Sequence, residues 1–424
     1  MKQLIRSAES QLARLPMPVA LRLPGGRQIG PAQPGVTLEF ARWPGLALLV
    51  AGKIGAVAEA FVEDKVRIEG AMRDVMAVAA GLLPGNPVST QSAWWRGLLR
   101  RARSAAAHSL DRDARQIQFH YDVSDDFYGL WLDPRRVYSC AYFADGGMTL
   151  AQAQEAKLDL ICRKLMLRPG ETFLDIGSGW GGLLMWAAEH YGVDATGITL
   201  SHNQQKHVQR LIAAKGLQDR VRVQLRDYRS MDADWRFDKI ASVGMFEHVG
   251  MANLGAYFGT IYRLLKPGGL VLNHGITAGG QGGQQLGAGM GDFIEKYIFP
   301  GGELVHVSHL LKETAAAGLE MVDTENLRPH YARTLWAWSD ALEAQLGAAR
   351  AALASSGSPS QAERILRAYR LYLAGSAMSF EQSWIALHQM LSARPATGHG
   401  FDTLPGAQSV YPFTRDYMYA GTAP

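Results

Sequence analysis

Three glycines after a short apolar stretch are the first residues of this chain whose spacing suggests chemistry. Gly177, Gly179 and Gly182 follow the mostly apolar residues 173–176 and satisfy a Gly-x-Gly-x-x-Gly pattern. A strand, a glycine-rich turn and a helix in this order let a ligand approach the backbone closely, and the helix offers free N–H groups at its start. The pattern alone is weak, because the same turn can simply pack a helix against a strand.

The residues after the second expected strand separate two classes of ligand. A dinucleotide site has an Asp or Glu there, about 20 residues beyond the glycines, which binds the ribose. Residues 196–201 read Thr-Gly-Ile-Thr-Leu-Ser and contain no acid. Asp175 stands directly before the glycines instead. This arrangement favours S-adenosylmethionine, whose carboxylate would meet backbone amides and whose amine would meet nearby acids.

Two further polar residues, Glu247 and His274, come after the fourth expected strand and at the end of the fifth. Parallel sheets bind ligands beyond the carboxyl ends of their strands, so we expect both side chains in a site. Cys140 is harder to assign, because a lone cysteine is most often a small buried hydrophobe. Tyr331, considered by itself, is typical of a half-buried packing residue.

The elements that must position these residues alternate between strand and helix from residue 152 onward. This alternation predicts an α/β fold with a parallel sheet and helices on both faces. Residues 275–291 are rich in glycine and indicate a loop or lid, followed by a helical insertion from residue 293. The expected strands are residues 173–176, 194–200, 221–225, 239–243 and 269–273, with 319–324 and 384–391 as a sixth and a seventh. The expected helices are residues 154–167, 203–215, 254–265, 334–353 and 361–373.

A smaller N-terminal unit of mixed helix and strand is expected before this region. It would contain short strands at residues 36–41 and 46–51 and a helix at 70–83. Residues 92–107 then predict a helix with tryptophans on one arc and most of its arginines opposite. That helix either packs its tryptophans on the body of the protein or meets anionic lipid. The expected domains are residues 1–110, 111–395 and a C-terminal tail at 396–424.

Composition narrows the functional class. The chain has 424 residues and is 47% hydrophobic, which suits two domains with well-packed cores. A formal net charge of +4 lacks the excess of a nucleic-acid binder. Two cysteines make neither a disulfide framework nor a multi-cysteine metal site, so we expect no metal. Since no apolar run approaches the roughly 18 residues of a spanning helix, we expect a cytoplasmic protein, soluble or peripheral to the membrane.

Several motifs, taken in order, resemble the cyclopropane-fatty-acyl-phospholipid synthase family over about residues 115–395. The resemblance implies a class I methyltransferase with a Rossmann-like sheet and a helical insertion, preceded by a smaller lipid-binding α+β domain that is matched only faintly. The motifs are residues 138–143 (Tyr-Ser-Cys-Ala-Tyr-Phe), 175–182 (Asp-Ile-Gly-Ser-Gly-Trp-Gly-Gly), 197–201 with Gln204, 244–250 (Gly-Met-Phe-Glu-His-Val-Gly) and 296–302 (Lys-Tyr-Ile-Phe-Pro-Gly-Gly).

The resemblance also implies a reaction and its residues. These enzymes add the methyl carbon of S-adenosylmethionine across a cis double bond of a phospholipid acyl chain and close a cyclopropane ring. The base is a bound bicarbonate, held by groups that correspond here to Glu247, His274, Tyr331 and the backbone of Cys140 and Ile276.

For the cofactor, Thr199 and Gln204 are expected to replace the missing ribose acid, and Asp227 and Tyr228 to meet the adenine. The full set of expected cofactor-binding residues is Tyr138, Ser139, Asp175, Gly177, Gly179, Thr199, Leu200, Gln204, Asp227 and Tyr228.

Three alternatives stay open at this point. A related enzyme would give a methyl or methylene branch, or would methylate a small amine, and a non-catalytic lipid carrier would keep only the fold. We expect partners of lipid character, namely a phospholipid membrane surface and unsaturated acyl chains, with a homodimer as an open option. Glu303 and the three residues after it depart from the Leu-Pro-Ser of many relatives, which leaves the acyl position undecided.

Overall fold

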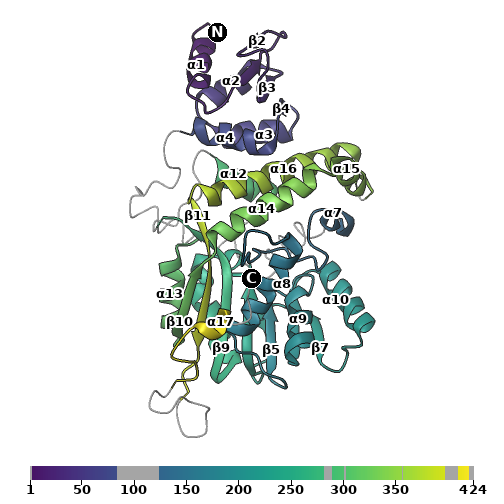
Figure 1. Ribbon diagram of the computed structural model, residues 1–424, viewed down its shortest axis with the longest axis vertical. Coiled ribbons are helices and arrows are strands. Elements are labelled where there is room, and N and C mark those ends of the chain that lie inside the picture. Colours follow the sequence, from purple (N-terminus) through teal and green to yellow (C-terminus); the bar gives the residue numbers. More distant parts are fainter. Residues whose placement is uncertain are drawn as a thin grey trace.

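The computed structural model describes residues 2–83, 124–280, 289–299, 302–355, 357–396 and 409–419, and it shows three tiers (Figure 1). A small N-terminal unit lies at one end, a layer of helices follows, and a large sheet flanked by helices lies at the other end. The expected helix at residues 92–107 and the expected domain boundary at residue 110 lie outside the described residues.

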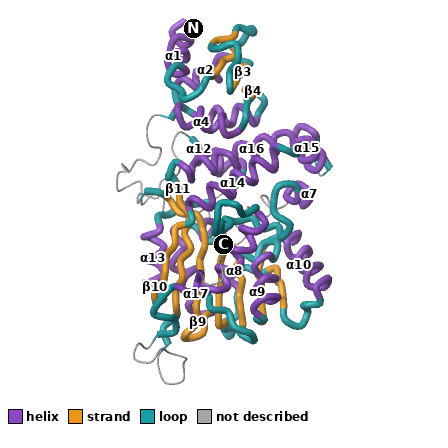
Figure 2. Tube along the Cα trace, in the orientation of Figure 1, coloured by secondary structure: helices purple, strands orange, loops and turns teal. Residues whose placement is uncertain are grey.

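The large sheet has seven strands in the order β10-β11-β9-β8-β5-β6-β7. Figure 2 shows these strands in orange with helices around them. Neighbouring strands from β7 to β9 are parallel, whereas β11 is antiparallel to both β9 and β10. The expected α/β class is therefore confirmed, and the carboxyl ends of five parallel strands meet at one edge. The strands are β5 (Thr172–Ile176), β6 (Asp194–Thr199), β7 (Val221–Leu225), β8 (Phe237–Val243), β9 (Leu265–Ala278), β10 (Glu320–Asn326) and β11 (Ile385–Ala393).

Helices cover both faces of this sheet, because alternate strand residues point to opposite sides. One face packs Phe173 and Leu272 against α8 (Leu150–Lys164), α9 (Gly182–Tyr191) and α10 (His202–Lys215). The other packs Leu174 and Val271 against α11 (Leu254–Leu264) and α13 (Val307–Ala316). Helix α7 (Asp125–Gly129) lies beside α15 (Leu346–Ala354), and α17 (Asp416–Tyr419), near the C-terminal end, lies against α8.

The helical layer contains α12 (Met290–Tyr297), α14 (Arg328–Glu343), α15 (Leu346–Ala354) and α16 (Pro359–Glu381). The single helix expected at residues 334–353 is two helices, which meet at Ala344 and Gln345. Part of the loop expected at residues 275–291 is also regular structure, because β9 continues to Ala278. Three of these helices stand between β10 and β11 in the chain, as a helical insertion requires.

The N-terminal unit has its own four-stranded sheet in the order β2-β1-β3-β4, with β1 and β3 parallel. Residues 46–51 are not the expected strand, because residues 46–50 belong to helix α2 and Ala51 is its C-cap. Pro44 stands in its first turn, where a missing N–H is tolerated, and Leu46 and Leu49 bury one face. The elements are α1 (Lys2–Leu12), β1 (Val19–Arg22), β2 (Gln28–Ile29), β3 (Val36–Phe40), α2 (Trp43–Val50), α3 (Ile54–Val62), β4 (Val66–Glu69) and α4 (Met72–Leu82).

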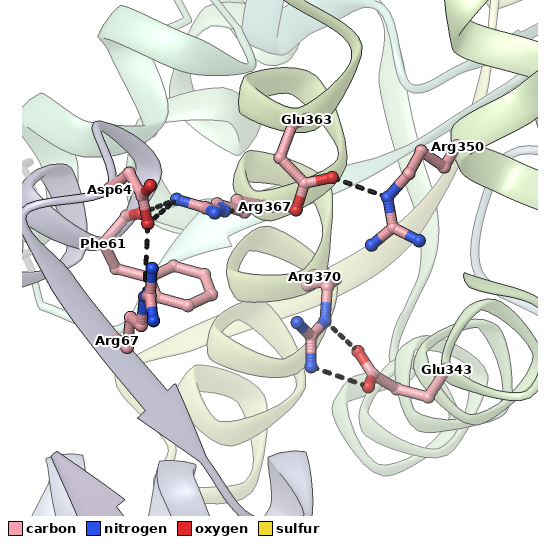
Figure 3. A network of polar contacts seen from close by, with 8 residues as sticks. All are labelled: Phe61, Asp64, Arg67, Glu343, Arg350, Glu363, Arg367 and Arg370. Atoms are coloured by element: carbon pink, nitrogen blue, oxygen red, sulfur yellow. Dashed lines mark hydrogen bonds and ion pairs between the residues drawn. The ribbon is translucent and has the colours of Figure 1, made fainter. Parts of the chain in front are cut away.

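This unit rests on the helical layer through α3 and α4. Helix α3 contacts α12 and α16, and α4 contacts α16. The backbones of α3 and α12 approach so closely that a Cβ added at Gly55 would lie 2.1 Å from the carbonyl oxygen of Gly289. Arg367 of α16 pairs with Asp64 at 2.9 Å and donates to the carbonyl of Phe61 at 3.3 Å (Figure 3). The N-terminal unit is therefore held on the helical layer by close packing of helices and by an ion pair.

Candidate active site

A cleft at the carboxyl edge of the sheet brings together most of the residues expected to bind the cofactor. We call it the cofactor cleft. Its walls come from the turns after β5, β6, β7 and β8. Among the residues lining it are Gly177, Gly179, Thr199, Leu200, Gln204, Asp227 and Tyr228.

Gly177 fits this cleft for two physical reasons. Its φ of +78° lies in the left-handed region, which side chains disfavour. A Cβ at this position would also lie 2.6 Å from the Cγ of Met245, which is too close. The turn can therefore bring its backbone to a ligand only with glycine here.

The polar groups of the cleft are held in place by their own neighbours. Thr199 donates its hydroxyl to Gln204 Oε1 at 2.7 Å, and Ser201 caps the helix that carries Gln204. Asp227 is already engaged, because Arg229 binds both of its carboxylate oxygens at 2.9 and 2.7 Å. A ligand hydroxyl would have to share Asp227 with that guanidinium.

Asp175, Tyr138 and Ser139 do not line this cleft. Asp175 is buried in β5, and burial raises its pKa to about 7 although the charge of Lys157 opposes the shift. Lys157 is buried too, which lowers its pKa to about 8, and it donates to the Ser139 hydroxyl at 2.8 Å. Tyr138 and Ser139 line a second cavity, and Tyr138 bonds Tyr372 at 3.3 Å. Asp175 thus lies in β5, just before the glycine turn, and is not part of the wall of the cleft.

The second cavity is large, apolar and continuous between two parts of the molecule. It has a volume of about 260 Å³. Residues of the N-terminal unit, chiefly of α3 and α4, line one part, and the helical layer lines another. The segment after β8, residues 274–276 of β9, residues 138–140 and the start of β11 also contribute. Gly244 and His248 line both this cavity and the cofactor cleft, so the two spaces adjoin. All five residues expected to be catalytic line the apolar cavity, namely Cys140, Glu247, His274, Ile276 and Tyr331.

Glu247 places a buried carboxyl group at this junction. Its Oε1 accepts from the backbone N–H of Ile276 at 2.6 Å, and its Oε2 has no hydrogen-bond partner among the described residues. Burial raises the pKa of Glu247 to about 7. Gly275 makes room for this contact, since a Cβ there would lie 2.8 Å from Glu247 Oε1. In this structure, the Ile276 amide therefore orients the carboxyl group.

His274 presents a second buried polar atom to the same space. Its Nδ1 bonds the side-chain amide of Gln389 at 3.2 Å, whereas Nε2 has no partner in the described part of the chain. Burial and the charges of Lys157 and Lys164 hold the pKa of His274 well below its usual range. The imidazole is therefore neutral at physiological pH.

Cys140 and Tyr331 complete the wall. Burial raises the pKa of the Cys140 thiol well above its ordinary value, so the thiol stays protonated and is a poor nucleophile. Tyr331 is buried with its ring 4.7 Å from that of Phe380. Both residues are better suited to forming the wall of an apolar cavity than to covalent catalysis.

Sequence reasoning assigned no site role to Lys157 and Lys164 of α8 or to Gln389 of β11. Lys157 and Lys164 are each 1% exposed, although lysine is almost never fully buried without a partner. Seven residues separate them, so they share one helix face with Gln154 and Ile161. Two lysines on the buried face of a helix, together with Gln154, are the signal that could have found them. No comparable signal marks Gln389, because its contacts depend on strand register.

The sheet order with one antiparallel strand and the glycine turn after β5 define a class I methyltransferase. Residues 108–390 match the family described as mycolic acid cyclopropane synthetase. The chain therefore belongs to this family of S-adenosylmethionine-dependent methyltransferases.

Named relatives agree with this assignment. The chain is 43% identical over 411 residues to a probable fatty acid methyltransferase of Pseudomonas putida, covering 96% of this chain and 98% of that one. The solved cyclopropane synthase MmaA2 from Mycobacterium tuberculosis is 36% identical with a TM-score of 0.61, covering 66% of this chain and 98% of its own. The mycolic acid cyclopropane synthase CmaA1, solved with SAH and CTAB, is 39% identical with a TM-score of 0.60, covering 66% and 97%.

Proposed function

We propose that the protein transfers the methyl carbon of S-adenosylmethionine to a cis double bond in a phospholipid acyl chain and closes a cyclopropane ring. The observation that carries the proposal is the apolar cavity that adjoins the cofactor cleft at Gly244 and His248. An acyl chain lying in that cavity would bring its double bond beside the cofactor. The unpartnered polar atoms of Glu247 and His274 lie on the wall of the same cavity.

The chain's own residues account for the positioning that such a reaction needs. An alkene is a weak nucleophile, so it must be held in line with the sulfonium methyl group, and apolar walls also exclude water. The carbocation that forms is stabilised by aromatic faces, at roughly 0.5–2 kcal/mol per contact. The aromatic residues that line the cavity include Tyr138, Phe299, Tyr331 and Phe380.

The residues present fit a bound bicarbonate, which would supply the proton acceptor for ring closure. Glu247 Oε2 and His274 Nε2 are buried and unpartnered within the described residues, which favours a small polar ligand between them. A carboxyl group with a pKa of about 7 is partly protonated at neutral pH and can donate to an anion. Tyr331 would be a further contact. We include bicarbonate in the proposal on these grounds.

We also propose that the substrate is drawn from a membrane surface. Lipid acyl chains reside there, and the apolar cavity reaches into the N-terminal unit. Among the described residues no helix is both long and apolar enough to cross a bilayer. Peripheral attachment on the cytoplasmic face would give the cavity access to its substrate.

The direct test uses the full-length protein with S-adenosylmethionine and vesicles of phospholipid with cis-unsaturated chains. We expect acyl chains heavier by one CH₂ group, with ring protons in the NMR spectrum, and a rate that rises when bicarbonate is added back to depleted buffer. No mass gain with any unsaturated phospholipid would refute the proposal. Turnover that is indifferent to bicarbonate would refute only the assignment of the base.

A second candidate is transfer that ends in a methyl or methylene branch. It is favoured by the relative of Pseudomonas putida, described as a probable fatty acid methyltransferase rather than a cyclopropane synthase. A methylene product has the mass of the ring, so NMR must separate the two. A reduced methyl branch is heavier by two further hydrogens and appears directly in the mass spectrum.

A further inference from the structure

A row of polar side chains crosses the sheet beneath α8 and ends at His274. His274 of β9 stands opposite Gln389 of β11, and Gln389 stands opposite Glu325 of β10. Residues opposite one another on neighbouring strands bring their side chains within reach. Lys164, at the end of α8, meets this row from the helix that covers it.

The contacts in this row fix the direction of each hydrogen bond. Lys164 Nζ donates to Glu325 Oε2 and, at 2.7 Å, to Gln389 Oε1. An ammonium group has donors only, so it must face the oxygen of the Gln389 amide. The amide nitrogen, which can only donate, then faces His274 Nδ1 at 3.2 Å.

The proton of His274 follows from this direction. Nδ1 accepts from Gln389 and therefore carries no proton, and a neutral imidazole must then carry its proton on Nε2. Burial and the nearby lysines keep the ring neutral, as the lowered pKa of His274 indicates. Nε2 is the atom that has no partner among the described residues, in a side chain that lines the apolar cavity.

We propose that Lys164, Gln389 and Glu325 are positioning residues that hold His274 as its Nε2–H tautomer and so present a hydrogen-bond donor to an anion in the apolar cavity. The opposite tautomer would turn a lone pair toward the anion and repel it. The purpose of the donor rests on the proposed function, whereas the tautomer itself does not. Glu325 anchors the far end of the row, because its carboxylate compensates the buried ammonium of Lys164.

The tautomer can be read directly by NMR. The full-length protein is labelled with ¹⁵N in its 12 histidines, and the signals of His274 are identified by their loss in His274→Gln. The two ring nitrogens of a neutral histidine differ strongly in chemical shift according to which one carries the proton. We expect a single tautomer protonated at Nε2, and protonation at Nδ1 in the unaltered protein would overturn the proposal without any variant.

Two substitutions then alter the row. Gln389→Glu keeps the shape but replaces the donor with a carboxylate, so we expect the proton to move to Nδ1 and kcat to fall on the order of ten-fold or more. KM for S-adenosylmethionine should not change, because the cofactor cleft is untouched. Lys164→Met frees the amide to rotate, so we expect signals of both tautomers.

A matched control is Lys239→Met. Lys239 is also a buried lysine, paired with Glu171 at 3.8 Å, but it lies near the start of β8 and does not line the cavity. We expect the His274 signals of this variant to equal those of the unaltered protein. If the Nε2–H tautomer remained the only form of His274 in Gln389→Glu or in Lys164→Met, the proposed role of the row would be overturned. Absence of lipid turnover would refute the proposed function and leave the tautomer result standing.

Discussion

At the scale of single residues, the candidate site depends on ionisable groups that are kept out of water. Glu247 and Asp175 both have pKa values near 7 because burial disfavours their charged forms. Such groups reduce folding stability at neutral pH, so their burial, in β5 for Asp175 and in the short 3-10 helix after β8 for Glu247, suggests a functional reason. For Glu247 the reason that we propose is a carboxyl group able to donate a hydrogen bond to an anion in the apolar cavity.

The first prediction concerns the rate. Glu247→Gln keeps an oxygen for the Ile276 amide but removes the acidic group, so we expect kcat to fall about 10²-fold or more. Affinity for S-adenosylmethionine, measured by calorimetry, should stay near that of the unaltered protein. Glu303→Gln is the matched control. The Glu303 side chain accepts from the Met251 N–H and its own backbone N–H donates to the Glu247 carbonyl, but Glu303 does not line the cavity. A full-rate Glu247→Gln enzyme would refute the role.

The second prediction concerns stability against pH for the same variant. The pKa of Glu247 rises from 4.5 in the unfolded chain to about 7 in the folded protein. Below pH 4.5 both states are protonated, and between pH 4.5 and 7 the unfolded state loses its proton first, so the unaltered protein loses stability as pH rises. We therefore expect the free energy of unfolding of Glu247→Gln, relative to that of the unaltered protein, to rise by roughly 3 kcal/mol between pH 4.5 and 7. Above pH 7 this difference should level off.

Denaturant unfolding at pH 4, 5, 6, 7 and 8 measures this difference. Glu9→Gln removes the same charge from an exposed position on α1 and should show only a small difference that does not change with pH. A Glu247→Gln difference that is constant with pH, or that shrinks as pH rises, would contradict the assigned direction of the pKa shift.

At the scale of elements, the periodicity of the chain predicted the sheet well and the N-terminal unit less well. Alternating strands and helices identify a parallel sheet because each strand is a buried apolar run followed by an amphipathic helix. A short apolar run such as residues 46–51 has no such partner, and helix and strand bury it equally well. Pro44 was the signal that the run begins a helix.

The site residues that the sequence did not predict are those whose contacts depend on the pairing register of the strands. The glycine turn and Glu247 follow strand ends, which a sequence shows directly. His274 was expected at the end of the fifth strand but lies inside β9, which continues to Ala278. Gln389 meets His274 only because β11, more than a hundred residues later, pairs with β9 in one particular register. No local pattern encodes that pairing, so the row behind His274 required the structure.

The third prediction concerns the docking of α3 on α16. Arg367→Ala removes the ion pair with Asp64 and the bond to the Phe61 carbonyl (Figure 3). Asp64 is half exposed, so we expect a loss of about 1 kcal/mol and a roughly five-fold faster amide exchange in α3 and α4. Arg350→Ala is the control, since Arg350 bonds Glu363 of α16 at 2.7 Å, a residue that Arg367 also contacts. Equal exchange in both variants would argue against the docking role.

At the scale of the whole molecule, two units share one cavity. The residues of α3 and α4 that line it were expected to belong to a smaller lipid-binding domain, and the match to the family begins at residue 108. Apolar side chains in the N-terminal unit look like ordinary core residues in the sequence. Only docking on the helical layer turns some of them into the wall of a cavity that ends at Glu247 and His274.

The last prediction follows from this sharing. Ala79 of α4 lines the cavity, whereas Ala77 of the same helix does not. Ala79→Trp should fill the N-terminal end, so we expect conversion of the longest acyl chains to fall on the order of ten-fold while shorter chains are converted normally. Vesicles that carry a mixture of chain lengths, analysed by mass spectrometry of the products, report this ratio within one reaction. Ala77→Trp should leave the ratio unchanged. If Ala79→Trp instead lowered the conversion of all chain lengths equally, the N-terminal unit would contribute to folding or membrane contact but not to selectivity for chain length.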